Sequence, residues 1–267
     1  MRLHDHCRKP EPRFAGNNTD YWIGMELEVE APTHFKRIAG LEIAKRPRYF
    51  YAKRDGSLSS YGWELVTHPI SPNLWLGKEK PNNPASKVFA LVKALKGLSY
   101  TSYDNQRCGL HLHVSRTAFS TDGSLKNKHN YWFCRLIHGK LFASLSQRAQ
   151  SDLDCWAKQL EPKYFLRKGG NNSRYFATTT TPATVEVRIF RGNMREDRIR
   201  KAIESVVAAI KFSKTFSPAR SQEKLDKIFA RWVMKNETSF PNLASYLREI
   251  NYVVKSEDTS EVSFQCA

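Results

Sequence analysis

Four short segments that carry acidic or imidazole side chains at alternate positions constrain this chain more than any other feature. In chain order they are 24–30 (GMELEVE), 55–66 (DGSL, then ELV), 108–114 (CGLHLHV) and 184–190 (TVEVRIF). Alternate residues of a β-strand point to the same face. Carboxylates on such a face must be paired or metal-bound if they are buried. We therefore expect four strands lining one polar cavity, with divalent cations as the compensating charge.

In the first segment, Glu26 and Glu28 lie two residues apart. This spacing separates their side chains by about 7 Å along the strand, which leaves room for one cation per carboxylate. Carboxylate-rich sites suit Mg²⁺ or Mn²⁺, which keep coordination positions open for phosphate oxygens. Taken alone, however, the pattern of Glu26 to Glu30 is more typical of a solvent-exposed strand face with basic neighbours.

The next two segments are also ambiguous when each is taken alone. Asp55 begins an Asp-Gly-Ser sequence that is typical of a turn, and a single strand residue such as Glu64 is more often exposed than functional. His111 and His113 fit a metal or phosphate site and a solvated strand face about equally well. Gly109 would let a ligand or another backbone approach closely.

In the fourth segment, Glu186 and Arg188 share a strand face. An arginine beside a metal-bound glutamate suits phosphoryl transfer, because its planar guanidinium can neutralise charge on the transferred group. A simple ion pair is the alternative. Arg174 and Arg191 are further candidates for phosphate contacts.

The rest of the chain predicts an α+β fold with a mainly antiparallel sheet. Proline and hydrophobic periodicity predict loops and helices between the strands. Further strands are expected at 48–53 and 173–180, a loop at 71–84, and helices at 85–96, 131–145, 199–212, 221–235 and 241–249, while 36–46 is ambiguous.

Composition narrows the class of protein. The net charge of +17 over 267 residues indicates anionic partners or substrates. The basic residues are dispersed, so we interpret the charge as a global field and not as a nucleic-acid motif. No apolar run approaches the roughly 18 residues of a membrane span, and no signal peptide is evident, so we expect a cytoplasmic protein without membrane contact. The five cysteines include no Cys-x-x-Cys pair, which argues against a structural zinc site.

Together, the four motifs in this order resemble the amidoligase family of the glutamine synthetase-like carboxylate–amine ligases. The resemblance covers roughly residues 20–215. It implies a curved antiparallel sheet of the glutamine synthetase type with helices on its outer face. We therefore expect a flexible lead-in at 1–19, a catalytic domain at 20–215, and a helical C-terminal extension of the same domain at 216–267.

The resemblance also implies a division of labour among the candidate residues. One metal would be held by Glu26, His111 and Glu186 and would bridge the phosphates of ATP. A second metal would be held by Glu28 and Glu64, with either Asp55 or Glu30 as the last carboxylate. Arg188, His113 and Glu64 would take part in the chemistry, and Arg188, Arg174, Arg191 and His113 would contact the nucleotide.

The expected function is an ATP- and Mg²⁺-dependent ligase that forms an amide or peptide bond through an acyl phosphate. Its substrates would be an amino acid, a peptide or another amine- or carboxylate-bearing molecule, and the positive charge would suit an acidic macromolecule. The alternative is a nucleic-acid-binding protein or a metal-dependent nuclease that uses the same carboxylates. The Gly-x-His-x-His and Glu-x-Arg motifs favour the ligase, since a simple binding module needs neither.

Overall fold

The protein is described from a computed structural model of the chain. The structure describes residues 4, 10–17, 19–45, 48–77, 82–103, 107–162, 173–216 and 222–252. The remaining parts of the expected lead-in and C-terminal extension, including 253–267, lie outside the described residues.

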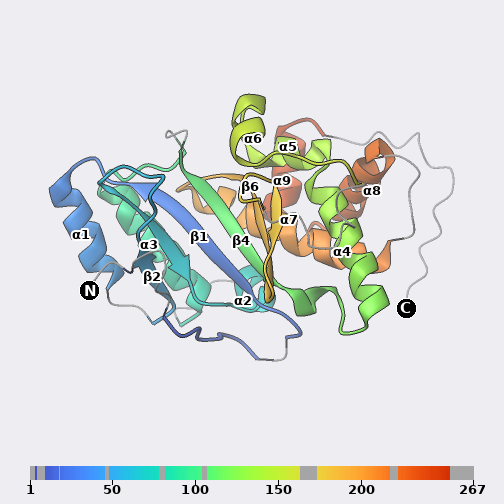
Figure 1. Ribbon diagram of the computed structural model, residues 1–267, viewed down its shortest axis with the longest axis horizontal. Helices are drawn as coiled ribbons and strands as arrows, with labels where there is room; N and C mark the ends of the chain where they lie inside the picture. The colour runs from blue at the N-terminus through green and yellow to red at the C-terminus, as the bar shows by residue number, and fades with distance from the viewer. Residues whose placement is uncertain are drawn as a thin grey trace.

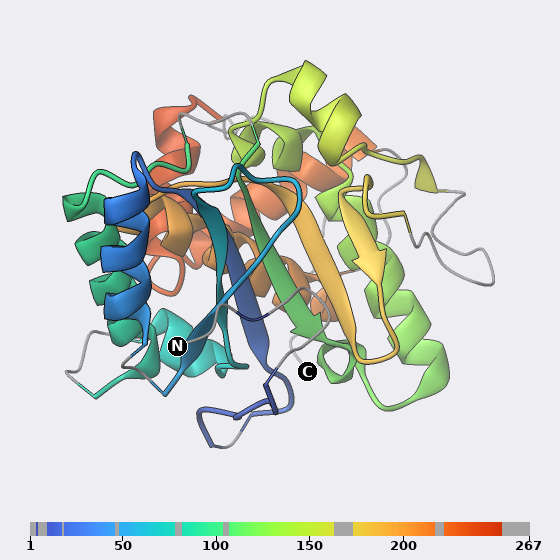
Figure 2. The same ribbon diagram turned by 60° about the vertical axis from the view of Figure 1, so that its left-hand side comes forward.

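A six-stranded antiparallel sheet forms the centre of the fold (Figures 1 and 2). The strand order is β2-β3-β1-β4-β6-β5, so the first motif strand lies between the second and the third. The strands are β1 (Ile23–Glu30), β2 (Phe50–Lys53), β3 (Gly62–Thr67), β4 (Gly109–Ser115), β5 (Thr178–Thr180) and β6 (Thr184–Arg191). The predicted antiparallel sheet, with the four motif segments as neighbouring strands or strand ends, is confirmed.

The two faces of the sheet differ sharply in chemistry, because side chains alternate along each strand. Met25 and Leu27 of β1, Leu112 of β4 and Val187 of β6 are fully buried in the hydrophobic core. The residues between them carry the carboxylates and imidazoles, which therefore share the opposite face.

Helices cover the apolar face of the sheet, and the C-terminal helices lie behind it in Figure 2. They are α1 (His34–Ala44), α2 (Pro72–Leu76), α3 (Pro84–Gly97), α4 (Gly123–Ile137), α5 (Lys140–Ser146), α6 (Gln150–Trp156), α7 (Glu196–Thr215), α8 (Gln222–Lys235) and α9 (Pro241–Glu249), with a short 3₁₀ helix η1 (Arg116–Phe119). The central helix is α7, which contacts α2, α3, α4, α8 and α9. None of the helices in the described ranges has the length and hydrophobicity of a membrane-spanning segment.

Local structure departs from the sequence prediction in three places. The helix expected at 131–145 is two helices, α4 and α5, separated at His138 and Gly139, where Gly139 takes an extended conformation as the N-cap of α5. Only 178–180 of the strand expected at 173–180 joins the sheet, because Phe176 N–H donates to Ser173 O in a turn before it. The expected loop at 71–84 contains the short helix α2. This helix begins at Pro72, because proline is favoured at the first position of a helix.

Parts of the expected lead-in are attached to the sheet. Ala15 is buried, its N–H donates to Pro69 O, and its carbonyl accepts from Ser71 N–H. His4 pairs with the outer edge of β2, where its backbone bonds to Ala52 and Arg54. At the other end of the chain, α8 and α9 pack on α7.

Candidate functional site

The polar face of the sheet gathers its candidate ligands into two groups. One group contains Glu26, His113 and Glu186, and the other contains Glu28, Asp55 and Glu64. Within each group, one ligand atom per residue lies within 4.8 Å of the others. We call these the first and second clusters.

Strand register explains why these residues meet. Glu28 of β1 lies directly opposite Glu64 of β3, while His113 of β4 lies opposite Glu186 of β6. Glu26 is opposite His111 on the β4 side of β1. The two carboxylates of β1 therefore face different neighbouring strands, and each joins a different cluster.

Two imidazoles lie between the carboxylates of the first cluster. His113 Nε2 is 3.4 Å from Glu26 Oε1 and 4.0 Å from Glu186 Oε1. His111 Nδ1 is 3.6 Å from Glu186 Oε1 and 4.0 Å from Glu26 Oε2. The structure thus brings both histidines to this cluster.

Charge states in the first cluster follow from burial and neighbouring charges. Burial, then Arg188, holds the pKa of His111 well below its ordinary value, so this imidazole is neutral. Its Nδ1 makes no hydrogen bond within the described part of the chain. Burial opposes ionisation of Glu26, but His113 and Lys53 outweigh it and bring the pKa of Glu26 well below the ordinary value. A neutral imidazole beside an ionised carboxylate is the form in which both bind a metal.

The second cluster places three carboxylates together. Glu28 accepts a hydrogen bond from Gly109 N–H, and Asp55 accepts one from Ser57 N–H in the turn before β3. Burial raises the pKa of Glu28 to about 7. Burial and the neighbouring Glu26 raise the pKa of Glu64 to about 9. In the absence of an added cation, Glu28 and Glu64 therefore tend to retain protons, because two buried carboxylates beside the half-buried Asp55 cannot all be ionised at low cost.

Three basic side chains partly balance the two clusters. The Lys53 ammonium contacts Glu64 and lies 3.9 Å from Glu26 Oε2. The Arg188 guanidinium contacts Glu186 on the same strand. Arg148 Nε and Nη2 each donate over 3.2 Å to the carbonyls of Ile189 and Phe190, and the charge of Arg148 acts on Glu28.

Sequence reasoning missed two of these cations. Lys53 carried a usable signal, because it lies two residues before Asp55 at the end of a strand. Arg148 carried none, since it follows α5 in a connecting segment far from every motif. Its role depends on the tertiary contact with β6.

The structure does not bring the other predicted residues into either cluster. Arg174 is stacked over the ring of exposed Tyr175, 5.2 Å from its centroid. Arg191 donates from Nε to Tyr103 O over 2.8 Å. Glu30 points to the β2–β3 connection and accepts a hydrogen bond from Ser59 N–H over 2.8 Å. Of the two carboxylates that the sequence left open, Asp55 is the one that joins the second cluster.

The donor set fits divalent cations. The clusters contain five carboxylates, Glu26, Glu28, Asp55, Glu64 and Glu186, against the three cations Lys53, Arg148 and Arg188. The excess is negative, and the ligands are oxygen atoms with an imidazole. Such a set suits Mg²⁺ or Mn²⁺ and lacks the thiolates of a zinc or iron–sulfur site.

Comparison with solved structures gives distant structural likenesses. The fold is similar to that of Plasmodium falciparum glutamine synthetase solved by cryo-EM, with a TM-score of 0.42 and 10% sequence identity. The alignment covers 89% of this chain and 74% of that one. No protein-family model matches the sequence, and no curated protein matches it. The resemblance to amidoligases therefore rests on the four motifs.

Proposed function

We propose that this protein is an ATP- and Mg²⁺-dependent carboxylate–amine ligase that forms an amide or peptide bond. The observation that carries the proposal is the pair of clusters on one buried face of the sheet. Phosphoryl transfer from ATP to a carboxylate brings two anions together, so a catalyst needs concentrated positive charge at that point. Two adjacent groups of oxygen ligands, flanked by Arg188, Arg148 and Lys53, offer a place to assemble it.

Each cluster has a distinct role in this proposal. Glu26, Glu186 and an imidazole would hold the cation that neutralises the phosphates of ATP. Glu28, Asp55 and Glu64 would hold the cation nearer the acceptor carboxylate and amine. The bound Mg²⁺ ions would supply charge neutralisation and Lewis acidity.

Arg188 is placed to act on the transferred phosphoryl group. Its guanidinium already contacts Glu186, so a phosphate bound at the first cluster would lie within its reach. His113 faces the same cluster and is more exposed than His111, with side-chain exposures of 20% and 7%. His113 therefore has the freer access to a substrate.

The proposed reaction has two steps. A carboxylate oxygen of the substrate attacks the γ-phosphorus of ATP, which gives an acyl phosphate and ADP. An amine then attacks the acyl carbon, and phosphate leaves with the C–O bond electrons as the amine loses a proton. The products are an amide, inorganic phosphate and ADP. An amino acid, a peptide or an acidic macromolecule could supply the carboxylate, and the last would suit the net charge of +17.

Trapping the acyl phosphate tests this proposal. The protein is incubated with Mg²⁺, ATP, hydroxylamine and pools of amino acids or peptides, and ADP and hydroxamates are measured. We expect hydroxamate in the same amount as ADP, with both lost in Glu28→Gln. Hydrolysis of DNA or RNA without ADP release would support the nuclease alternative and contradict the ligase.

A further inference from the structure

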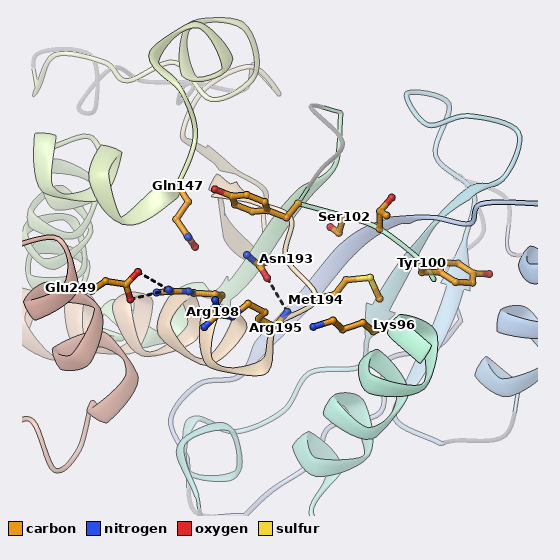
Figure 3. A pocket seen from close by; sticks show the side chains of 11 residues that line it. Lys96, Tyr100, Ser102, Gln147, Asn193, Met194, Arg195, Arg198 and Glu249 are labelled. Carbon is orange, nitrogen blue, oxygen red and sulfur yellow. Dashed lines mark hydrogen bonds and ion pairs between the residues drawn. The ribbon is translucent and has the colours of Figure 1, made fainter. Parts of the chain in front are cut away.

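A second polar cavity lies outside both clusters, at the end of the sheet where α7 begins. Its volume is about 460 Å³. Figure 3 shows that its walls come from the end of α3, the segment after it, the end of α5 and the start of α7. The lining residues that carry the argument are Lys96, Gln147, Asn193, Arg195, Arg198 and Glu249.

The amide side chains of this cavity have their oxygen atoms engaged by the protein. Asn193 Oδ1 accepts from Arg195 N–H over 2.8 Å, and Gln147 Oε1 accepts from Lys201 Nζ over 3.2 Å. A backbone N–H can only donate, and so can an ammonium group, so these contacts fix the orientation of both amides. Their NH₂ groups are therefore the atoms left to interact with a ligand.

Asn193 is the more telling of the two. It is only 7% exposed, yet its Nδ2 has no hydrogen-bond partner within the described part of the chain. Figure 3 shows this amide at the centre of the cavity wall. This NH₂ group is not one of the fully buried unpaired atoms of the described residues, so it reaches the cavity and is available to a ligand acceptor.

The acidic groups at the cavity are likewise already engaged. Both carboxylate oxygens of Glu249 accept from Arg198 Nη2, over 2.7 and 2.8 Å. Asp197 accepts from Arg195 over 2.8 Å. Lys96 has no acidic partner in the described ranges. The surface offered to a ligand is thus rich in donors and poor in acceptors.

The backbone at Gln147 strengthens the case for a built site. Gln147 has φ +61°, a left-handed conformation that non-glycine residues seldom adopt. This conformation is a common way for a helix to end, and it fixes the direction in which the chain leaves α5. Here it ends α5 and directs the amide between Lys201 and the cavity.

We propose that this cavity binds the carboxylate or phosphoryl group of a small anionic molecule through Asn193 Nδ2, Gln147 Nε2 and the Lys96 ammonium. The site is separate from the ligands of the proposed ligase. It is also structurally close to them, because Ser102 lines the cavity and donates from Oγ to the carbonyl of Glu28 over 2.7 Å.

Two isosteric substitutions test the proposal. Asn193→Asp and Gln147→Glu keep the oxygen that accepts from the protein but replace the donor with a second, anionic oxygen. The matched control is Asn73→Asp, the same chemical change at an exposed position of α2 outside the cavity. Inorganic phosphate and succinate are the probes, titrated calorimetrically at constant ionic strength without ATP or metal.

We expect the unsubstituted protein to bind at least one probe saturably, and each of the two variants to bind it at least 10-fold more weakly, with Asn73→Asp unchanged. Preference for phosphate or for succinate then identifies the anionic group. If either variant fails to fold, as judged by circular dichroism, Lys96→Met at an exposed position replaces it and should also weaken binding. The absence of saturable binding, or equal binding by all folded variants, would overturn the proposal. Because no ATP is present, this result is independent of the ligase test.

Discussion

The Lys53 ammonium contacts the buried carboxyl group of Glu64 between the two carboxylate clusters, and it also lies 3.9 Å from Glu26. It is therefore a cation built into the protein at the point where negative charge is most concentrated. Its position is fixed from both sides, because β2 pairs with β3 on one edge and with the backbone of His4 on the other.

We predict that Lys53→Met lowers the free energy of unfolding by up to about 3–5 kcal/mol, because it leaves the ionised Glu26 buried without this cation. Glu26→Gln should reduce that loss, so the double variant is more stable than the sum of the two single changes implies. Urea unfolding of all four proteins at pH 7, without metal, measures the coupling. Additive effects would mean that the pair contributes no specific interaction.

Both carboxylate clusters are predicted to be necessary for ATP turnover. Glu28→Gln and Glu186→Gln should abolish ATP turnover at saturating Mg²⁺ while the protein stays folded. We expect the melting temperature of Glu28→Gln to be no lower than that of the unsubstituted protein, because a repelling charge is removed. Normal turnover in both variants would show that these residues are not part of a catalytic site.

Asp55 and Glu30 provide an internal comparison for the same assay. Asp55→Asn should reduce turnover strongly, because it removes a carboxylate of the second cluster. Glu30→Gln should retain turnover, since Glu30 bonds to Ser59 outside both clusters. The reverse result would assign the last carboxylate to Glu30 and contradict the geometry described above.

Arg188 is predicted to stabilise the transition state of phosphoryl transfer more than the binding of ATP. Arg188→Ala should lower kcat by about 100- to 1,000-fold, equivalent to about 2.7–4 kcal/mol. Arg188→Lys should restore only part of the rate, because it lacks the planar fork. Steady-state ATP turnover separates the two parameters, and an effect on KM alone would make Arg188 a binding residue.

The buried His138 should lower the free energy of unfolding of this protein in acid. Burial lowers the pKa of this imidazole to about 3, and it is held between Leu160 N–H and Thr178 Oγ1, each at 2.9 Å. In the unfolded state His138 binds a proton near pH 6.5, whereas in the folded state it does not. The stabilisation of the folded state that depends on the neutral imidazole is therefore complete above pH 6.5 and is lost as the pH drops towards 3.

Between pH 7 and pH 4.5, protonation of His138 in the unfolded state should cost about 2.5 kcal/mol of stability. His138→Gln removes the titrating group, so the difference in unfolding free energy between the two pH values should shrink by that amount. Chemical denaturation of both proteins at the two pH values measures it. An unchanged difference would show that His138 does not control the acid sensitivity.

Local pattern predicted much of the sheet. The alternation in 24–30, 109–115 and 184–191 depends only on strand geometry, and these segments form β1, β4 and β6. Hydrophobic periodicity similarly predicted α3, α7, α8 and α9. It did not reveal the break between α4 and α5, because the apolar spacing runs through His138 and Gly139 without interruption.

The alternation of side chains along a strand could not predict which carboxylate joins which cluster. Period-2 spacing places Glu26, Glu28 and Glu30 on one face and cannot distinguish them. Register separates them, because Glu28 lies opposite Glu64 and Glu26 lies opposite His111, while Glu30 turns to Ser59. The family resemblance had implied the grouping of Glu28 and Glu64, with the choice between Asp55 and Glu30 left open, but no physical property of the isolated segments did.

The sequence by itself determined that this chain has a charged strand face, because side-chain alternation is a local consequence of backbone geometry. Only the tertiary structure decided which charges balance one another. Lys53 and Arg148 reach the carboxylates, while Arg174 and Arg191 are held elsewhere by Tyr175 and Tyr103. The donor-rich cavity is likewise formed by segments as distant as Lys96 and Glu249. Such contacts join residues that are far apart in the sequence, so they depend on strand pairing and helix packing over the whole fold. A short window of sequence does not contain that information.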